Sequence, residues 1–290
     1  MVRKPRIAIV GPGRLGSALA VELRRARYRV SEIVSGDSAA SRRKARALAH
    51  QVHARWSAEG ARVDADVIWF CVPDREIARA AKQLAGTVDW RGKVAFHSSG
   101  ALGSDELREL RRRGAAVASV HPLMTFVSRS VPSLLGVPFA LEGDAAALRV
   151  AGRIVRDLGG EAFSISKNKK LAYHAWGAFL APLLVSLLVT GEQVARVAGL
   201  SNAAARRKML PIVRQTVANY AKMGPAGASS GPIVRGDAEV VRGHLKELRK
   251  ISEAGEVYEA LARAALRYLP AGNRKELEKL LGGRGRSKSL

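Results

Sequence analysis

The sequence is poor in cysteine, in aromatic residues and in acidic residues, and each scarcity excludes a class of protein. Cys71 is the single cysteine of 290 residues, which excludes a disulfide framework and a four-cysteine zinc site. Aromatic residues make up 5% of the chain and leave few side chains for stacking on nucleic-acid bases. The basic N-terminus runs into a strand-like segment with no signal-peptide pattern, so we expect a cytoplasmic protein.

The scarcity of acidic residues gives the chain a net charge of +24, from 49 basic and 25 acidic residues. This charge is spread along the chain: residues 1–165 hold 27 basic and 16 acidic residues, and residues 166–290 hold 22 and 9. No nucleic-acid-binding motif accompanies it, so we predict no specific nucleic-acid partner. The positive field instead favours anionic cofactors and substrates.

The one long uncharged run, residues 175–191, is 17 residues long and carries Pro182 near its centre. A membrane-spanning helix needs about 20 apolar residues, so we predict no membrane span. A helix that is apolar all round is typical of a domain core or a dimer interface. We therefore expect a homodimer that forms through this part of the chain.

Short apolar runs alternate with helical patterns in the first half of the sequence. Strands are predicted at 6–10, 29–34, 67–72, 93–97, 116–120, 137–141 and 162–165, with helices at 14–27, 38–50, 74–85, 104–113 and 145–158. Cap-type residues stand near four helix starts: Ser38, Asp74, Ser104 and Asp144. Such alternation indicates an α/β domain with a mostly parallel sheet covered by helices on both faces.

The strand patterns stop near residue 166. From there the sequence predicts only helices, at 168–198, 202–223, 238–250, 253–268 and 273–281. We therefore expect two domains: a Rossmann-type α/β domain over residues 1–165 and an all-helical domain over residues 166–290 that completes the active site.

A glycine-rich turn follows the first predicted strand and opens the first predicted helix. Its residues are Gly11, Pro12, Gly13, Arg14, Leu15 and Gly16. In a G-x-G-x-x-G turn the first glycine permits a tight bend, the second admits a pyrophosphate, and the third lets helix and strand pack closely. The helix N-terminus then offers free amides and partial positive charge to the phosphates. This context predicts a dinucleotide-binding domain.

The end of the second predicted strand discriminates NAD from NADP. Asp37 would suit the ribose hydroxyl of NAD, whereas Ser35 with Arg42 and Arg43 would suit the 2′-phosphate of NADP. We favour NADP and keep NAD as the alternative. Val72 and Pro73 follow the third strand, where the carboxyl-end loop is expected to face the cofactor. Cys71, within an apolar strand, is expected to be buried and inert.

Polar residues follow two further predicted strands. Ser98, Ser99 and Gly100 come after the strand that ends at residue 97, and we expect them to contact the nicotinamide or a substrate. A cap for the helix at 104–113 is the alternative role. His121 ends the next strand and is a candidate for orienting or protonating a substrate oxygen, with a core histidine as the alternative. No histidine or carboxylate cluster has metal-ligand spacing, so we predict no metal.

Four segments occur in a family-specific order: HSSG at 97–100, HPLMTF at 121–126, KLAYH at 170–174 and GPIVRGD at 231–237. With the glycine turn, they make the chain resemble Rossmann-like oxidoreductases whose C-terminal half is domain of unknown function 2520. That family is similar to pyrroline-5-carboxylate reductase, 3-hydroxyisobutyrate dehydrogenase and 6-phosphogluconate dehydrogenase. The resemblance implies NAD(P)-dependent hydride transfer and a dimer of interlocked helical halves.

The resemblance also implies site residues. The related dehydrogenases use a lysine that moves the substrate proton and a polar partner four residues later, here Lys170 and His174. The family's asparagine eight residues after that histidine is replaced by Pro182, so no role carries over there, and a helix kink is expected instead. Arg235 is a candidate clamp for a substrate carboxylate, Asp237 is expected as a helix cap, and His244 is a further substrate-binding candidate.

These observations predict hydride transfer between NADP(H) and a small carboxylate-bearing keto, hydroxy or imino substrate. A prephenate-dehydrogenase-like or ketopantoate-reductase-like enzyme is an alternative reading of the same motifs. A cofactor-binding regulator without turnover is the alternative from another class.

Overall fold

The computed structural model describes residues 3–127 and 131–282. The chain forms two compact units, Met1–Leu180 and Ala181–Leu290. The last strand ends at Ser164, next to the 165/166 domain boundary expected from the sequence. The compact units divide later, because helix α6 (Lys170–Leu180) stays with the strand unit through its buried residues Lys170 and Tyr173.

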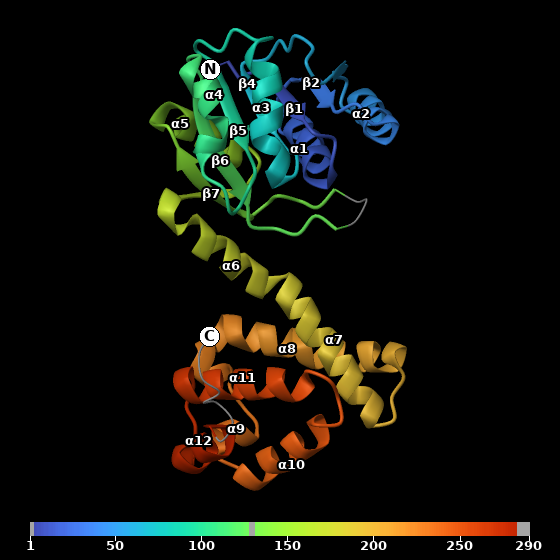
Figure 1. The fold of residues 1–290 in the computed structure, drawn as a ribbon, viewed down its shortest axis with the longest axis vertical. Coiled ribbons are helices and arrows are strands. Elements are labelled where there is room, and N and C mark those ends of the chain that lie inside the picture. The colour runs from blue at the N-terminus through green and yellow to red at the C-terminus, as the bar shows by residue number, and fades with distance from the viewer. Residues whose placement is uncertain (1–2, 128–130, 283–290) are drawn as a thin grey trace. The chain divides into compact units, whose positions relative to one another are not determined.

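The first unit is built on one eight-stranded sheet with the order β3-β2-β1-β4-β5-β6-β7-β8 (Figure 1). The strands from β3 to β6 are all parallel; β7 is antiparallel to β6, and β8 is parallel to β7. The predicted fold class is confirmed. The bounds are β1 (Ile7–Val10), β2 (Val30–Ser35), β3 (Arg55–Ala58), β4 (Val67–Phe70), β5 (Val94–His97), β6 (Ala116–Pro122), β7 (Pro138–Gly143) and β8 (Glu161–Ser164).

Helices cover both faces of this sheet. Leu19 of α1, Leu48 of α2 and Ile154 of α5 belong to the core on one face. Leu84 of α3 and Leu110 of α4 belong to the core on the other face. The helices are α1 (Arg14–Arg25), α2 (Ala39–Gln51), α3 (Ile77–Ala85), α4 (Arg108–Arg112) and α5 (Ala145–Asp157), and the short 3₁₀ turns are η1 (Asp74–Glu76), η2 (Ser104–Leu107) and η3 (Lys167–Lys169).

Strand β3 and three of the four expected caps differ from the sequence prediction. Of these four residues, Ser38 alone caps its helix, by accepting the Ser41 amide at 3.1 Å. The carboxylates of Asp74 and Asp144 and the hydroxyl of Ser104 bind partners outside their own helices. Strand β3 was missed because the segment Arg55–Ala58 lacks an apolar run.

The second unit is all helical, as predicted. Pro182 is the first residue of α7, and the helix expected over 168–198 breaks just before it, at Ala181. Helix α8 carries a break at Gly224, whose φ is 69°. Helix therefore continues to Ala228, past the end at residue 223 that the sequence predicts. The helices are α7 (Pro182–Val197), α8 (Asn202–Ala228), α9 (Pro232–Arg235), α10 (Ala238–Leu248), α11 (Ala254–Tyr268) and α12 (Arg274–Gly282), and their core includes Val241, Leu266 and Leu277.

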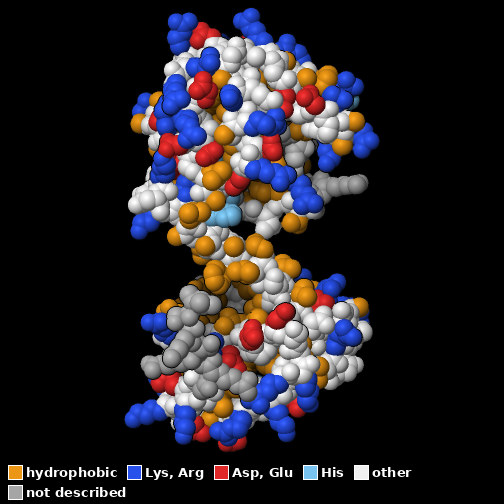
Figure 2. Space-filling model, in the orientation of Figure 1, with side chains coloured by type: hydrophobic (Ala, Val, Ile, Leu, Met, Phe, Trp, Pro, Cys, Tyr) orange, Lys and Arg blue, Asp and Glu red, His pale blue; other side chains and the backbone are white. Residues whose placement is uncertain are grey.

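Large apolar side chains lie exposed on α7 and α8, among them Val185, Ile212 and Val217. Figure 2 shows orange hydrophobic side chains gathered over α6 and the start of α7. Within the run at 175–191, Trp176, Phe179 and Val185 are exposed, so this run is not a buried core helix of the described chain. In the described part of the chain, one helical stretch, Lys167–Val197, is long and apolar enough to cross a membrane by length and composition alone.

Candidate active site

At two positions of the turn between β1 and α1, only glycine fits. Gly11 has a φ of +103°, and a Cβ there would lie 2.7 Å from the carbonyl oxygen of Cys71. A Cβ on Gly16 would lie 2.1 Å from the carbonyl oxygen of Gly11. The first and third glycines thus allow helix α1 to begin directly against the ends of β1 and β4. This is where strand order reverses, the usual ligand position in such sheets.

A cleft of about 350 Å³ opens at this turn. Six residues proposed from the sequence line it: Gly11, Pro12, Gly13, Ser35, Val72 and Pro73. Gly13 is exposed, and its virtual Cβ meets only one atom, at 3.8 Å, so the backbone here can be approached closely. Cys71 also lines the cleft; burial raises the pKa of its thiol to about 12, so the thiolate is disfavoured.

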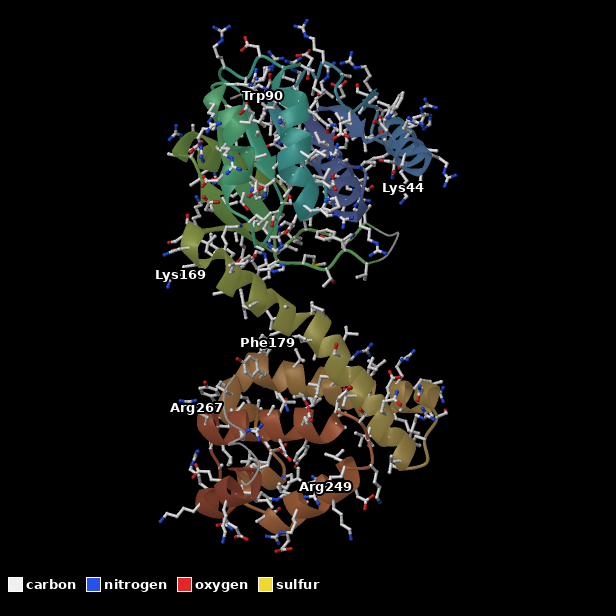
Figure 3. All side chains as sticks on the ribbon, viewed as in Figure 1. Lys44, Trp90, Lys169, Phe179, Arg249 and Arg267 are labelled. Atoms are coloured by element: carbon white, nitrogen blue, oxygen red, sulfur yellow. The ribbon has the colours of Figure 1, made fainter. Side chains whose placement is uncertain are left out.

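The cations that line the cleft differ from those expected. Arg42 and Arg43 are not among the lining residues, whereas Lys44 of the same helix is (labelled in Figure 3). Arg79 of α3 lines the cleft as well and pairs with Glu76 at 2.6 Å and Glu59 at 3.3 Å. The sequence argument missed Arg79 because α3 lies far along the chain from β2.

The end of β2 presents Ser35 and Gly36 to the cleft and no carboxylate of its own. Asp37 is exposed and does not line the cleft. Glu32, within the strand, is buried and accepts hydrogen bonds from Arg55 and Ser57. The lining hydroxyls Ser38 and Ser41 stand near Lys44 on the same helix. These donors suit a phosphate, and the two carboxylates that also line the cleft, Glu59 and Glu76, are paired with Arg79.

A second cluster forms at the same edge, on the loop after β5. His97 is fully buried; its Nε2 donates to the carbonyl of Gly103 at 2.9 Å, and its Nδ1 accepts the amide of Ser99 at 3.1 Å. Because Nδ1 accepts a hydrogen bond, the imidazole is neutral, in agreement with a pKa that burial lowers to about 4. His97 therefore shapes the loop that carries Ser98 and Ser99.

Ser99 links the cleft to this loop. Its hydroxyl donates to Asp74 at 2.7 Å and accepts the amides of Ala101 and Leu102. Asp74 directly follows Pro73, which lines the cleft. Ser98 instead accepts the indole N–H of Trp69 at 2.8 Å. Both hydroxyls are thus engaged in hydrogen bonds that order the loop. This arrangement resembles the structural alternative more than the expected contact with a ligand.

Lys170, the first residue of α6, is buried beneath that loop with 1% of its surface exposed. Its ammonium donates to the carbonyl of Ser99 at 3.1 Å and to the hydroxyl of Ser119 at 2.7 Å. Burial lowers its pKa to about 8, although the carboxylates of Glu142 and Asp74 oppose that shift. Lys169 beside it is exposed (Figure 3). Lys170 is therefore distinct from the solvated lysines that precede it.

His121 and His174 meet over Gly100. A Cβ on Gly100 would lie 2.9 Å from Nε2 of His121 and 2.8 Å from Cδ2 of His174. Nδ1 of His121 is 2.8 Å from the hydroxyl of Tyr173. Burial lowers the pKa of His121 to about 4, and the charges of Lys170 and His174 contribute. Four sequence-predicted residues, Gly100, His121, Lys170 and His174, are thus brought together.

Three residues of this cluster were missed by the sequence argument: Ser119, Tyr173 and Glu142. Glu142 accepts the amide and the hydroxyl of Ser104, at 2.6 and 2.9 Å. Ser119 and Glu142 are polar residues inside otherwise apolar strands. A polar side chain in a buried strand needs a hydrogen-bond partner, so this break in the apolar pattern could have identified both as site candidates.

Arg235 and His244 belong to the second unit. Arg235 pairs with Asp237 at 2.8 Å, and His244 hydrogen-bonds the hydroxyl of Tyr258 at 3.1 Å. Asp237 occupies the cap position of α10, but its carboxylate binds Arg235 and caps no helix amide. Within the described ranges, no three histidine, cysteine, aspartate or glutamate side chains are grouped as metal ligands.

Two family models match the chain. Residues 1–122 match the Rossmann-like domain, and residues 137–265 match the domain of unknown function DUF2520. The class of protein expected from the motifs is confirmed: this chain joins a Rossmann-like domain to a DUF2520 domain. A comparison with curated proteins finds no match.

Solved structures share the fold. Protein TM1727 from Thermotoga maritima is 25% identical over 94% of this chain and 99% of its own, with a TM-score of 0.71. Protein BF3122 from Bacteroides fragilis, provisionally named an NADP oxidoreductase, is 20% identical over 90% and 97%, with a TM-score of 0.73. A reductive aminase from Aspergillus terreus, solved with NADPH and ethyl-5-oxohexanoate, is 14% identical over 96% and 100%, with a TM-score of 0.62.

The neutral state of His97 gives a test of the buried loop. Its pKa is lowered in the folded protein, so the unfolded chain binds the extra proton below pH 6.5, and stability falls as the pH drops toward 4. We expect the protonation of His97 in the unfolded chain to lower the free energy of unfolding by about 1 kcal/mol at pH 5.5 relative to pH 8. Heteronuclear NMR should show its imidazole as the neutral Nε2–H form at pH 5.5; a charged ring at that pH would contradict the geometry.

Proposed function

We propose that this protein is an NADP(H)-dependent oxidoreductase that transfers hydride between the nicotinamide and the carbon of a C=O or C=N bond. The supporting observation is a continuous set of contacts. Pro73 lines the cleft at the glycine turn, Asp74 next to it accepts the hydroxyl of Ser99, and the carbonyl of Ser99 accepts Lys170. A dinucleotide in the cleft would therefore end beside the Lys170 cluster.

NADP is the proposed cofactor. Lys44, Ser38 and Ser41 line the cleft beyond the end of β2, where a 2′-phosphate would lie. The NADPH of the Aspergillus terreus reductive aminase and the name of the Bacteroides fragilis protein support the same choice. When bound, NADPH supplies the hydride; the residues of this chain position the acceptor and move the proton.

Hydride addition to a carbonyl carbon leaves an alkoxide, which needs one proton to become the alcohol; addition to an imine leaves an amide anion with the same need. His174 is exposed and lies at Gly100, so we assign it the proton donor's role. The buried ammonium of Lys170 places a positive charge beside the same loop and stabilises the developing anion. In the reverse direction His174 accepts the proton.

The substrate is proposed to be a small keto, hydroxy or imino acid. A net charge of +24 attracts anions, and Arg235 stays our candidate for its carboxylate, with His244 as a further candidate contact. A cytoplasmic location likewise remains a prediction from the sequence.

Turnover tests this proposal. Mixing the protein with NADPH and a panel of keto and imino acids should remove nicotinamide absorbance. Lys170→Ala and His174→Ala should each lower kcat by roughly 10²- to 10⁴-fold. Lys169→Ala, at the exposed neighbouring lysine, should leave it unchanged. Variants that still bind NADPH yet turn over at the wild-type rate would refute the assignment of these two residues.

We further propose that the protein is a homodimer formed through α7 and α8. Ile212 is 68% exposed and Val217 is 58% exposed, and patches of this kind usually mark interfaces. Burying them against a second copy would stabilise the dimer by roughly 25 cal/mol for each Å² of apolar surface.

A double variant tests the dimer. Ile212→Glu with Val217→Glu should shift the mass measured by light scattering from dimer to monomer, because two carboxylates would be desolvated at the interface. Leu135→Glu, at an exposed leucine of the first unit, is the matched control and should stay dimeric. A wild-type monomer at micromolar concentration would overturn this part of the proposal.

A further inference from the structure

Tyr173 contributes a buried hydroxyl to the site that no step of the hydride transfer uses. It is 6% exposed, and its ring packs edge-on against His121, with the ring centroids 5.5 Å apart at 88°. Phe163 packs on it at 6.0 Å and Trp176 at 6.1 Å. Three aromatic neighbours therefore hold the ring in place, and the hydroxyl points at Nδ1 of His121, 2.8 Å away.

The direction of that hydrogen bond follows from acidity. A phenol is a stronger donor than a neutral imidazole N–H, and an imidazole nitrogen is a stronger acceptor than a phenol oxygen. The favoured arrangement is therefore O–H of Tyr173 donating to Nδ1 of His121. Because one ring nitrogen then accepts, the proton of the neutral imidazole must sit on the other, Nε2.

Nε2 of His121 lies against the backbone of Gly100. It lies 2.9 Å from the position a Cβ of Gly100 would take, and it makes no hydrogen bond to any described residue. Since Gly100 has no side chain, the Nε2–H is presented beside the loop of Ser99 and beside His174. A neutral, fixed N–H is the kind of group that stabilises negative charge developing on a substrate atom.

We propose that Tyr173 is a positioning residue that fixes His121 as its Nε2–H tautomer, so that this N–H donates to the substrate's reacting oxygen or nitrogen. This inference rests on the proposed function. The two histidines beside Gly100 then have different roles. His121 donates a hydrogen bond to the substrate and keeps its proton, whereas His174 transfers its proton to the substrate.

NMR of the imidazole nitrogens tests the tautomer without any substrate. Wild-type His121 should show an accepting Nδ1 and a protonated Nε2, and Tyr173→Phe should shift it to a mixture of the two tautomers. Tyr28→Phe is the matched control, because it also deletes a buried hydroxyl bond, to Asp157 at 2.7 Å, in the same unit. It should leave the signals of His121 unchanged. An Nδ1–H form in the wild type would overturn the proposal.

A double-mutant cycle tests the consequence for turnover. Tyr173→Phe should lower kcat roughly tenfold and leave the KM for NADPH unchanged. In a His121→Gln background, whose amide N–H needs no tautomer, the same change should cost nothing further. Equal losses in both backgrounds would mean a structural role and would overturn the inference. If the wild type itself shows no turnover, the proposed function fails, and the NMR result still decides the role of Tyr173.

Discussion

The close approach of helix α1 to strands β1 and β4 is the constraint on which the rest of the site depends. A Cβ on Gly16 would lie 2.1 Å from the carbonyl oxygen of Gly11, and a Cβ on Gly11 would lie 2.7 Å from the carbonyl oxygen of Cys71. This close packing brings the amide-rich start of α1 to the edge where six parallel strands end. A cleft for an anion follows from the backbone alone, before any side chain contributes.

The neighbouring loop depends on buried polar groups that satisfy one another. Lys170 gives hydrogen bonds to Ser99 and Ser119, His97 bridges Ser99 and Gly103, and Glu142 holds Ser104. Such a network is stable only if each member keeps its partner, because an unpaired buried charge is costly. We infer that the network fixes the loop under the reacting atoms, while the exposed His174 is left free to exchange protons with solvent.

The sequence predicted the elements far better than the partners of individual side chains. Strand and helix patterns, the glycine turn and the break at Pro182 are local, so composition and spacing were sufficient for them. Asp74 and Ser104 were expected as helix caps, but each binds a residue more than twenty positions away. Lys44 lines the cleft and Arg42 and Arg43 do not, because the three side chains point in different directions around helix α2. Tertiary contacts of this kind leave no periodic pattern in the sequence, so they could not be predicted from it.

Calorimetric titration of the purified protein with NADPH and with NADH tests the central claim most directly. If the cleft at Gly13 seats a pyrophosphate and Lys44 meets a 2′-phosphate, NADPH should bind at one site per chain and at least about tenfold more tightly than NADH. Absence of binding heat from both nucleotides at several temperatures, with no rise in melting temperature, would contradict the account.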